Sequence, residues 1–331
     1  MQLGASIAVG DLGAGPTAMR DYAQAAEGLG FDYLVAPDHV LGIDPGKIAP
    51  GQRGSNATAY HDPFVLFAFL AGVTKKIGFA AGVLILAQRQ AALVAKQAAS
   101  LDALCEGRFR LGVGVGWHEI EFQGLGMDFH TRGVRSAEQV RFMQALWAKE
   151  GVTFNGKYHE LTDGGINPRP KSGKVEVWFG GHAEATLKRV AKYGDGFMPN
   201  RWPPGDEVLK TFDRLRGMIK AAGRKPEDVG LEVWTSPGKG TPRASYSTVF
   251  QPVPTPRRSR SPERMATSAA CLATSAAWRW GRISTVEANS SVVVTPAAKA
   301  KNVSGSWKPV SLSYGPLKPA WRLRSAPSTW S

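Results

Sequence analysis

Cysteine is scarce in this chain of 331 residues: the two cysteines, Cys105 and Cys271, lie far apart and form no CxxC pair. This spacing indicates neither a disulfide framework nor a zinc site. The histidines show no HxxxH or HExxH pattern, which would place two metal ligands on one helix face. The sequence therefore predicts no metal site. The six histidines are His39, His61, His118, His130, His159 and His182.

Long hydrophobic runs are also absent. The longest, near residues 64–73 and 77–87, are too short to span a bilayer. The first 15 residues have neither a basic start nor a sustained apolar segment, so they do not resemble a signal peptide. We therefore expect a cytoplasmic protein without a membrane span. With 43% hydrophobic residues, the chain can bury a sizeable core.

Acidic residues are almost missing from the last part of the chain. Residues 236–331 contain 14 Lys and Arg against only Glu263 and Glu287, together with 11 of the 22 prolines. Residues 1–235 contain 27 basic and 25 acidic residues, so most of the net charge of +14 belongs to the tail. We interpret residues 1–235 as one domain and residues 236–331 as a basic tail rich in Ser, Pro and Arg.

Strands and helices alternate along residues 1–235. Short β-favouring runs end at turn residues, and apolar residues at helical spacing follow. This repeat predicts an α/β fold with a parallel sheet, and seven strands point to a TIM-type (β/α)8 barrel without its last strand and helix. Asn155-Gly156 predicts a hairpin inserted over residues 152–161. The predicted strands are residues 3–9, 33–36, 77–86, 109–115, 175–179, 196–198 and 231–235, and the predicted helices are residues 17–29, 64–73, 91–104, 132–149, 183–193 and 205–222.

The stretch of residues 175–200 combines a strand, a glycine turn and a helix. The strand ends at Gly180-Gly181, where unpaired N–H groups and the positive end of the helix meet, an arrangement that suits a phosphate. Because glycine has no Cβ, a ligand can approach this main chain closely. A tight turn that binds nothing has the same local sequence, so the turn alone leaves both interpretations open.

Two other predicted strands also run into segments that suit a ligand. Asp38 and His39 follow the second strand, and the long loop of residues 42–61 comes next, which is more often functional than structural at this length. The small centre of the third strand, residues 80–82, leaves room for a planar ligand. These segments would meet at the carboxyl ends of the strands.

The glycine-rich run of residues 110–117, RLGVGVGW, invites a dinucleotide-binding interpretation. Counted from Gly112, the third glycine of GxGxxG falls at Trp117, and no helix start follows directly. The run is therefore not a Rossmann fingerprint. Alternating glycines fit a strand that leaves room on one face, with Trp117, His118 and Glu119 in the loop beyond it.

Six motifs occur in a fixed order along residues 1–235. They are APDH at 36–39, AGVLILAQRQ at 81–90, CEGRFRLGVGVGW at 105–117, DFHTRG at 128–133, INPRP at 166–170, and VWFGGHAEA at 177–185 leading to GDGFMPN at 194–200. Each motif alone is weak, but in this order they resemble the bacterial luciferase-like monooxygenase superfamily and specifically its coenzyme F420-dependent oxidoreductases.

The resemblance implies a TIM-type barrel that holds a deazaflavin, or FMN in some relatives, at the carboxyl ends of its strands and transfers hydride to or from it. A small organic molecule would be the substrate, and a homodimer is a candidate assembly. FMN-dependent monooxygenase activity is the alternative to F420-dependent hydride transfer. Neither nucleic acid nor a metal is expected as a partner.

Site residues follow from the same resemblance. His39 matches the histidine beside the reactive face of the deazaflavin, where it would move a proton or stabilise charge. Trp117 departs from relatives that carry a catalytic glutamate there, and Glu119 is either its replacement or a solvated carboxylate. Relatives have a non-prolyl cis peptide where Gly82-Val83 lies. The residues implied to bind cofactor are Asp38, Gly82, Val83, Val115, Gly116, Gly180, Gly181 and His182.

The resemblance ends abruptly after Thr235. We hypothesise that residues 236–331 come from a shifted reading frame that replaces the end of the barrel, which would leave two sheet edges open and impair the enzyme. The alternative is a basic disordered extension. In that case the protein would be an inactive barrel fragment whose run PRRSRSPER at 256–264 binds anionic partners through charge.

Overall fold

The computed structural model describes residues 2–7, 9–47, 54–199 and 205–233, all within one compact unit, Met1–Ala297. The expectations for residues 236–331 therefore lie outside the described residues. Among the described residues, no helix combines the length and the apolar character needed to cross a membrane.

A curved parallel sheet forms the centre of this unit. Its strands, in chain order, are β1 (Gly4–Ser6), β2 (Tyr33–Ala36), β3 (Gly78–Ala81), β4 (Leu84–Ile85), β5 (Phe109–Gly114), β8 (Glu176–Phe179), β9 (Gly196–Phe197) and β10 (Gly230–Leu231). Neighbouring strands follow the order β1, β2, β3, β5, β8, β9, β10, and β4 also pairs with β5. All these pairs are parallel, as expected for strands that alternate with helices.

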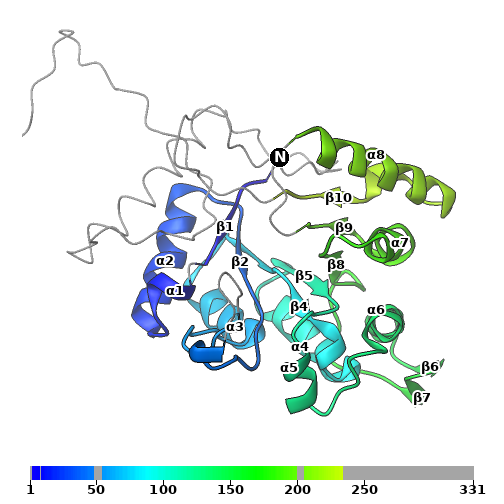
Figure 1. Ribbon diagram of the computed structural model, residues 1–331, viewed down its shortest axis with the longest axis horizontal. Helices are drawn as coiled ribbons and strands as arrows, with labels where there is room; N and C mark the ends of the chain where they lie inside the picture. The colour runs from blue at the N-terminus through cyan, green and yellow to red at the C-terminus, as the bar shows by residue number, and fades with distance from the viewer. Residues whose placement is uncertain (1, 8, 48–53, 200–204, 234–331) are drawn as a thin grey trace, which may run out of the picture. The chain divides into compact units, whose positions relative to one another are not determined.

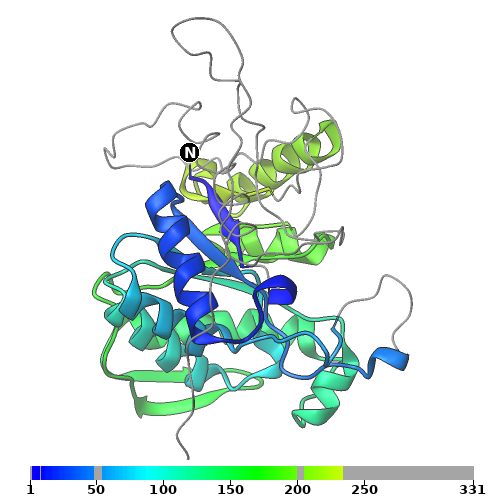
Figure 2. The same ribbon diagram turned by 90° about the vertical axis from the view of Figure 1, so that its left-hand side faces the viewer.

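Helices cover the outer face of the sheet (Figure 1). Each of the longer helices packs against the next along the chain, as far as α8. Figure 2 shows α2 in blue and α8 in yellow-green in separate parts of this layer. The helices are α1 (Val9–Leu12), α2 (Pro16–Leu29), α3 (Pro63–Val73), α4 (Ala91–Leu104), α5 (Glu119–Gly124), α6 (Arg132–Ala148), α7 (Glu184–Tyr193) and α8 (Asp206–Ala221).

The predicted order of strands and longer helices is confirmed, with local differences. The third predicted strand consists of β3 and β4, which both pair with β5 and are separated by Gly82 and Val83. α2 begins at Pro16, one residue before the predicted start, and Gly15 is its N-cap. The short helices α1 and α5 were not expected. Helices of four and six residues are too short to show a periodic apolar face in the sequence.

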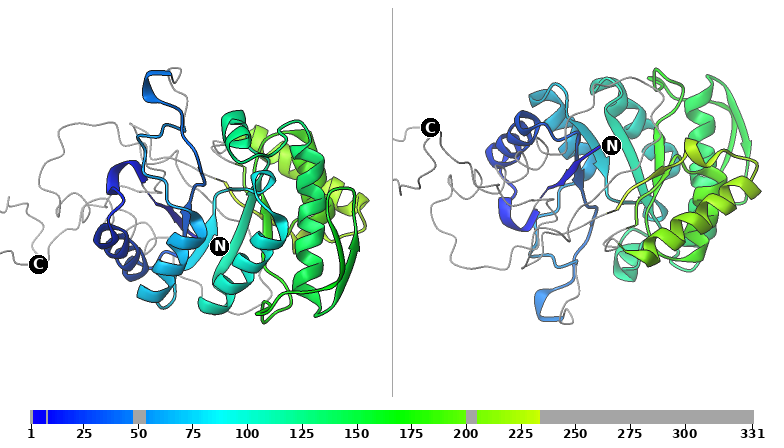
Figure 3. Two further views of the ribbon diagram at one scale, coloured as in Figure 1. Left: turned by 90° about the horizontal axis from the view of Figure 1, so that it is seen from below. Right: turned by 90° about the horizontal axis from the view of Figure 1, so that it is seen from above.

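The predicted hairpin is present as β6 (Val152–Asn155) and β7 (Glu160–Gly164), which pair antiparallel. Figure 3 shows it at the periphery, outside α6. The Glu138 carboxylate of α6 accepts hydrogen bonds from the backbone N–H groups of Lys157, Tyr158 and His159 at the turn. The hairpin is thus fixed to α6 rather than to the main sheet.

Arg110 fills the inner side of the sheet near the amino ends of its strands. Its guanidinium lies 4.1 Å from the ring centroid of Trp178 and 4.9 Å from that of Tyr33. It donates a hydrogen bond of 2.8 Å to Gln2 and lies 3.4 Å from the Glu232 carboxylate. Packed side chains therefore fill the inside of the sheet near the amino ends of these strands.

Pairing within the described residues ends at β1 and β10. β1 pairs with β2, and β10 pairs with β9; neither has a second strand partner among residues 2–233 that the structure describes. The described sheet is therefore curled as part of a barrel without a pairing between its first and last strands.

Candidate functional site

The residues predicted for the site lie at the carboxyl ends of the strands. His39 follows β2, Gly82 and Val83 separate β3 from β4, Val115 and Gly116 follow β5 directly, and Gly180 and Gly181 follow β8. All these positions are at the carboxyl ends of parallel strands, where α/β folds bind their ligands. The structure thus brings the predicted stretches to one side of the molecule; their contact with a cofactor stays a prediction.

Asp38 is an anchor between neighbouring strand ends. Its carboxylate accepts a hydrogen bond of 2.9 Å from the N–H of Ile85 in β4 and one of 2.8 Å from the Arg89 guanidinium, which also binds Asp62 at 2.9 Å. Burial raises the pKa of Asp38, and the positive charge of Arg89 opposes that rise. Both carboxylate oxygens have partners within the protein, so Asp38 holds the start of the His39 loop in place.

His39 lies among aromatic rings. Its ring centroid is 4.8 Å from that of Tyr60, 6.4 Å from Trp117 and 6.3 Å from His118. Its Nδ1 lies 3.5 Å from Oε1 of Glu121, within ion-pair distance if the imidazole is protonated but without the geometry of a hydrogen bond. The side chain is 14% exposed, so His39 has access to the site while most of its ring is enclosed.

Glu121, in α5, is a buried carboxylate that the sequence did not single out. Oε1 accepts hydrogen bonds from the N–H groups of Val40 (2.9 Å) and Leu41 (3.2 Å), and Oε2 accepts one from the Gln88 amide (3.1 Å). Burial alone would raise the pKa of Glu121, but the His39 imidazole, the Gln88 amide and the Leu41 N–H outweigh it and lower that pKa. The carboxylate is therefore charged at neutral pH.

The exposed Glu119 starts the same helix and stays in the solvent, as the solvated alternative predicted. The sequence gives no signal that separates the two carboxylates, because a helix of six residues is too short to show an apolar period. Glu121 and the fully buried Phe122 lie on one face of α5, whereas Glu119 and Ile120 lie on the other.

His118 is buried and has no hydrogen-bond partner among the described residues at either ring nitrogen. Its Nδ1 lies 3.6 Å from Oε2 of Glu121, and the half-exposed Trp117 ring stacks on it with centroids 4.9 Å apart. The ligand atoms of His39, His118 and Glu121 all lie within 4.8 Å of one another, a grouping that can hold a metal ion. Spacing patterns such as HxxxH do not detect this grouping, because His39 lies about 80 residues before His118 and Glu121; the prediction of no metal stays a prediction.

Val83 occupies the space that the glycines of neighbouring strands leave. The peptide between Gly82 and Val83 is cis, as the resemblance implies. A Cβ on Gly114 would lie 2.6 Å from one methyl of Val83, and a Cβ on Gly180 would lie 2.6 Å from the other. Gly114 in β5 and Gly180 after β8 thus make room for the protein's own Val83 side chain.

The glycine turn after β8 is only partly free to bind an anion. The N–H of Gly180 donates to Val113 in β5 (2.9 Å), so it belongs to the sheet. Gly181 has φ +119°, a left-handed conformation, and α7 begins after Ala183, which provides no side-chain cap. The N–H groups from Gly181 onwards are therefore the candidates for a phosphate, rather than that of Gly180.

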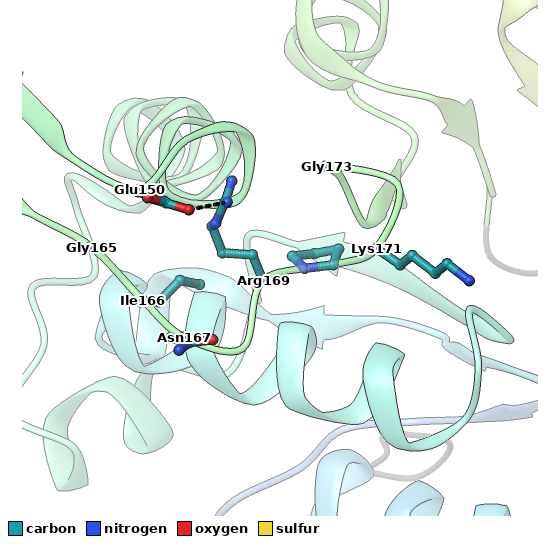
Figure 4. A pocket seen from close by; sticks show the side chains of 8 residues that line it. Glu150, Gly165, Ile166, Asn167, Arg169, Lys171 and Gly173 are labelled. Carbon is teal, nitrogen blue, oxygen red and sulfur yellow. Dashed lines mark hydrogen bonds and ion pairs between the residues drawn. The ribbon is translucent and has the colours of Figure 1, made fainter.

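A separate cavity of about 620 Å³ lies in the loop before β8, at the amino ends of the strands. Figure 4 shows Arg169 directed towards Glu150, with which it forms an ion pair of 3.1 Å. The loop contains the cis peptide Asn167–Pro168. None of the residues predicted for the site lines this cavity, so it is not the candidate functional site.

Known proteins match this chain in sequence over most of the described residues. The model of the luciferase-like monooxygenase family matches residues 3–236. An F420-dependent glucose-6-phosphate dehydrogenase of Kribbella flavida is 31% identical over 247 residues, which cover 71% of this chain and 70% of that relative. An FMNH2-dependent dimethylsulfone monooxygenase of Pseudomonas fluorescens is 28% identical over 184 residues, 55% of this chain and 47% of the relative, so the chain spans about half of its length.

Among solved structures, the fold is similar to that of an F420-dependent secondary alcohol dehydrogenase in complex with an F420-acetone adduct. The TM-score is 0.59 at 23% identity, and the match covers 70% of this chain and 68% of that chain. At this identity the likeness shows the fold alone, which is the TIM-type α/β architecture of a luciferase-like protein.

Proposed function

Because the chain belongs to the luciferase-like monooxygenase family, whose relatives include F420- and FMN-dependent enzymes, we propose that it is an F420-dependent oxidoreductase. It transfers hydride between the deazaflavin and a small organic substrate. The observation that carries this proposal is the position of His39, next to buried polar groups at the carboxyl ends of the strands that also carry the cis peptide and the glycine turn.

The residues present fit such a group. The ring nitrogens of His118 and Nδ1 of His39 are buried without a hydrogen bond among the described residues, so this edge offers polar groups for a ligand. The backbone at Gly82-Val83 and at Val115-Gly116 would flank the ring system. Gly181 and His182, with Asp38 holding the neighbouring loop, would position the phosphate end.

The deazaflavin supplies the carbon that accepts or gives up the hydride. The chain supplies the proton chemistry and the binding surface. His39 is the catalytic residue, because its imidazole can take the proton of a substrate hydroxyl or return it to a carbonyl oxygen as the hydride moves the opposite way. Tyr60 and Trp117 border His39 and provide apolar ring surface for an organic substrate.

FMN is the alternative cofactor, and the FMNH2-dependent relative is the observation that favours it. One experiment separates the two: purified protein is titrated with F420 and, in parallel, with FMN, and binding is followed by the distinct absorbance and fluorescence of each. We expect saturable binding of F420 that is at least about tenfold tighter than that of FMN. Tight FMN binding without F420 binding would reject the proposal in favour of a flavin monooxygenase.

A further inference from the structure

Three features meet at Glu121. The carboxylate is 1% exposed, it is held by three N–H donors from outside α5, and each of its oxygens faces an imidazole: Oε1 faces His39 at 3.5 Å, and Oε2 faces His118 at 3.6 Å. Burying a charged carboxylate is costly unless its oxygens are bound. The donors Val40, Leu41 and Gln88 stabilise this charge and fix the direction in which it points.

From this geometry we propose that Glu121 is the positioning residue of His39. Its charge draws Nδ1–H of His39 towards Oε1, which fixes the ring orientation and leaves Nε2 as the atom that takes up or returns the reaction's proton. A buried carboxylate that orients an imidazole through its other nitrogen is a recurrent device in catalysis and metal binding. This inference rests on the proposed function, since the proton in question accompanies the hydride.

The same geometry places His118 at the other carboxylate oxygen of Glu121, Oε2. His118 packs between the Trp117 ring and the carboxylate, and a Cβ on Gly54 would lie 3.4 Å from its Cε1 and 3.6 Å from that of His39. The two imidazoles thus share one negative charge.

Among the described residues, none of the other groups next to His39 brings a carboxylate to its ring. Tyr60 contacts it through the ring, and Trp117 has no titratable group. Asp38 precedes His39 in the chain, but its carboxylate is bound by Arg89 and by the Ile85 N–H. Glu121 is therefore the carboxylate that faces the imidazole.

The test compares Glu121→Gln with Glu119→Gln, which removes an exposed carboxylate from the same helix. The first measurement is the NMR titration of the histidine ring protons in the full chain without cofactor, with the His39 signal identified by its loss in His39→Asn. We expect Glu121→Gln to move the His39 titration to lower pH, because the imidazolium loses its anionic neighbour, and Glu119→Gln to leave it in place. This measurement is independent of the cofactor.

The second measurement is the pH profile of F420 reduction. The limb that requires the neutral imidazole, which takes the substrate's proton when F420 is reduced, should move to lower pH in Glu121→Gln, and Glu121→Asp, which keeps the charge, should restore part of the shift. If Glu121→Gln does not fold, Glu121→Asp alone must still move the His39 titration. An equal His39 titration in all variants would overturn the inference. Stoichiometric zinc in the purified protein that is lost in Glu121→Gln would also overturn it, because the carboxylate would then be a metal ligand. A shifted titration without any F420 turnover would instead reject the proposed function alone.

Discussion

At the scale of single residues, Gly181 offers a direct test of the phosphate turn. Its φ of +119° suits glycine, and a Cβ there would lie 3.2 Å from Oγ1 of Thr186. Gly181→Asp adds a negative charge where a phosphate is proposed to sit, so we expect cofactor affinity to fall at least about tenfold. Fluorescence titration measures the change.

Two control variants separate charge from backbone effects. Gly181→Ala adds a Cβ to the same left-handed backbone position without adding a charge. Lys188→Ala removes a cation from the exposed side of α7. We expect Gly181→Ala to lose less affinity than Gly181→Asp, and Lys188→Ala to lose least. If Lys188→Ala weakens binding as much as Gly181→Asp does, the turn is not the phosphate site.

Sequence alone could place His39 and the glycine positions at the carboxyl ends of the strands, because motif residues directly follow the predicted strands; their role stays a prediction. It could not select Glu121 over Glu119. That choice depends on which face of a six-residue helix turns inward, and on N–H donors at positions 40 and 41, about 80 residues away. It also could not tell that Val83, rather than a ligand, fills the space beside Gly114.

At the scale of elements, α3 depends on its N-cap residue, Asp62. The Asp62 carboxylate accepts hydrogen bonds from the N–H groups of Phe64 (2.9 Å) and Val65 (3.1 Å), which would otherwise lack a partner. We expect Asp62→Ala to lower the free energy of unfolding by about 1 kcal/mol, measured by urea denaturation. Asp62 also binds Arg89, so the cap has to be separated from the ion pair.

Asp62→Asn provides that separation, since the amide oxygen can still cap α3 while the negative charge beside Arg89 is lost. It should retain most of the stability that Asp62→Ala loses. A loss in Asp62→Asn equal to that in Asp62→Ala would show that the ion pair, not the cap, carries the effect.

The order of the longer helices and strands was predictable because their signals are local: apolar spacing, glycines and prolines occur within a few residues of each element. α4 begins and ends at the predicted residues, Ala91 and Leu104. The division of the third strand into β3 and β4 was not predictable from periodicity, because its apolar run continues through residues 82 and 83.

At the scale of the whole molecule, we propose that residues 236–331 impair the enzyme. The reason lies in the described residues, where β1 and β10 each have one strand partner, while a closed barrel gives every strand two. If the coding DNA holds a barrel-like peptide in another frame, a chain restored from it should be more soluble and turn over faster. Light scattering and F420 turnover measure both. A monodisperse sample with cooperative unfolding and turnover equal to that of the restored chain would contradict this proposal.

Arg110 also has a consequence for the order in which the chain assembles. Its partners Gln2 and Glu232 are 108 and 122 residues away in sequence, so these contacts close two of the longest loops in the described chain. During synthesis, Arg110 leaves the ribosome long before Glu232 has been made. Local contacts within each β and α pair can form in the meantime, and so can the contact with Gln2, which is made before Arg110. The contact with Glu232 has to wait for the end of the described sheet.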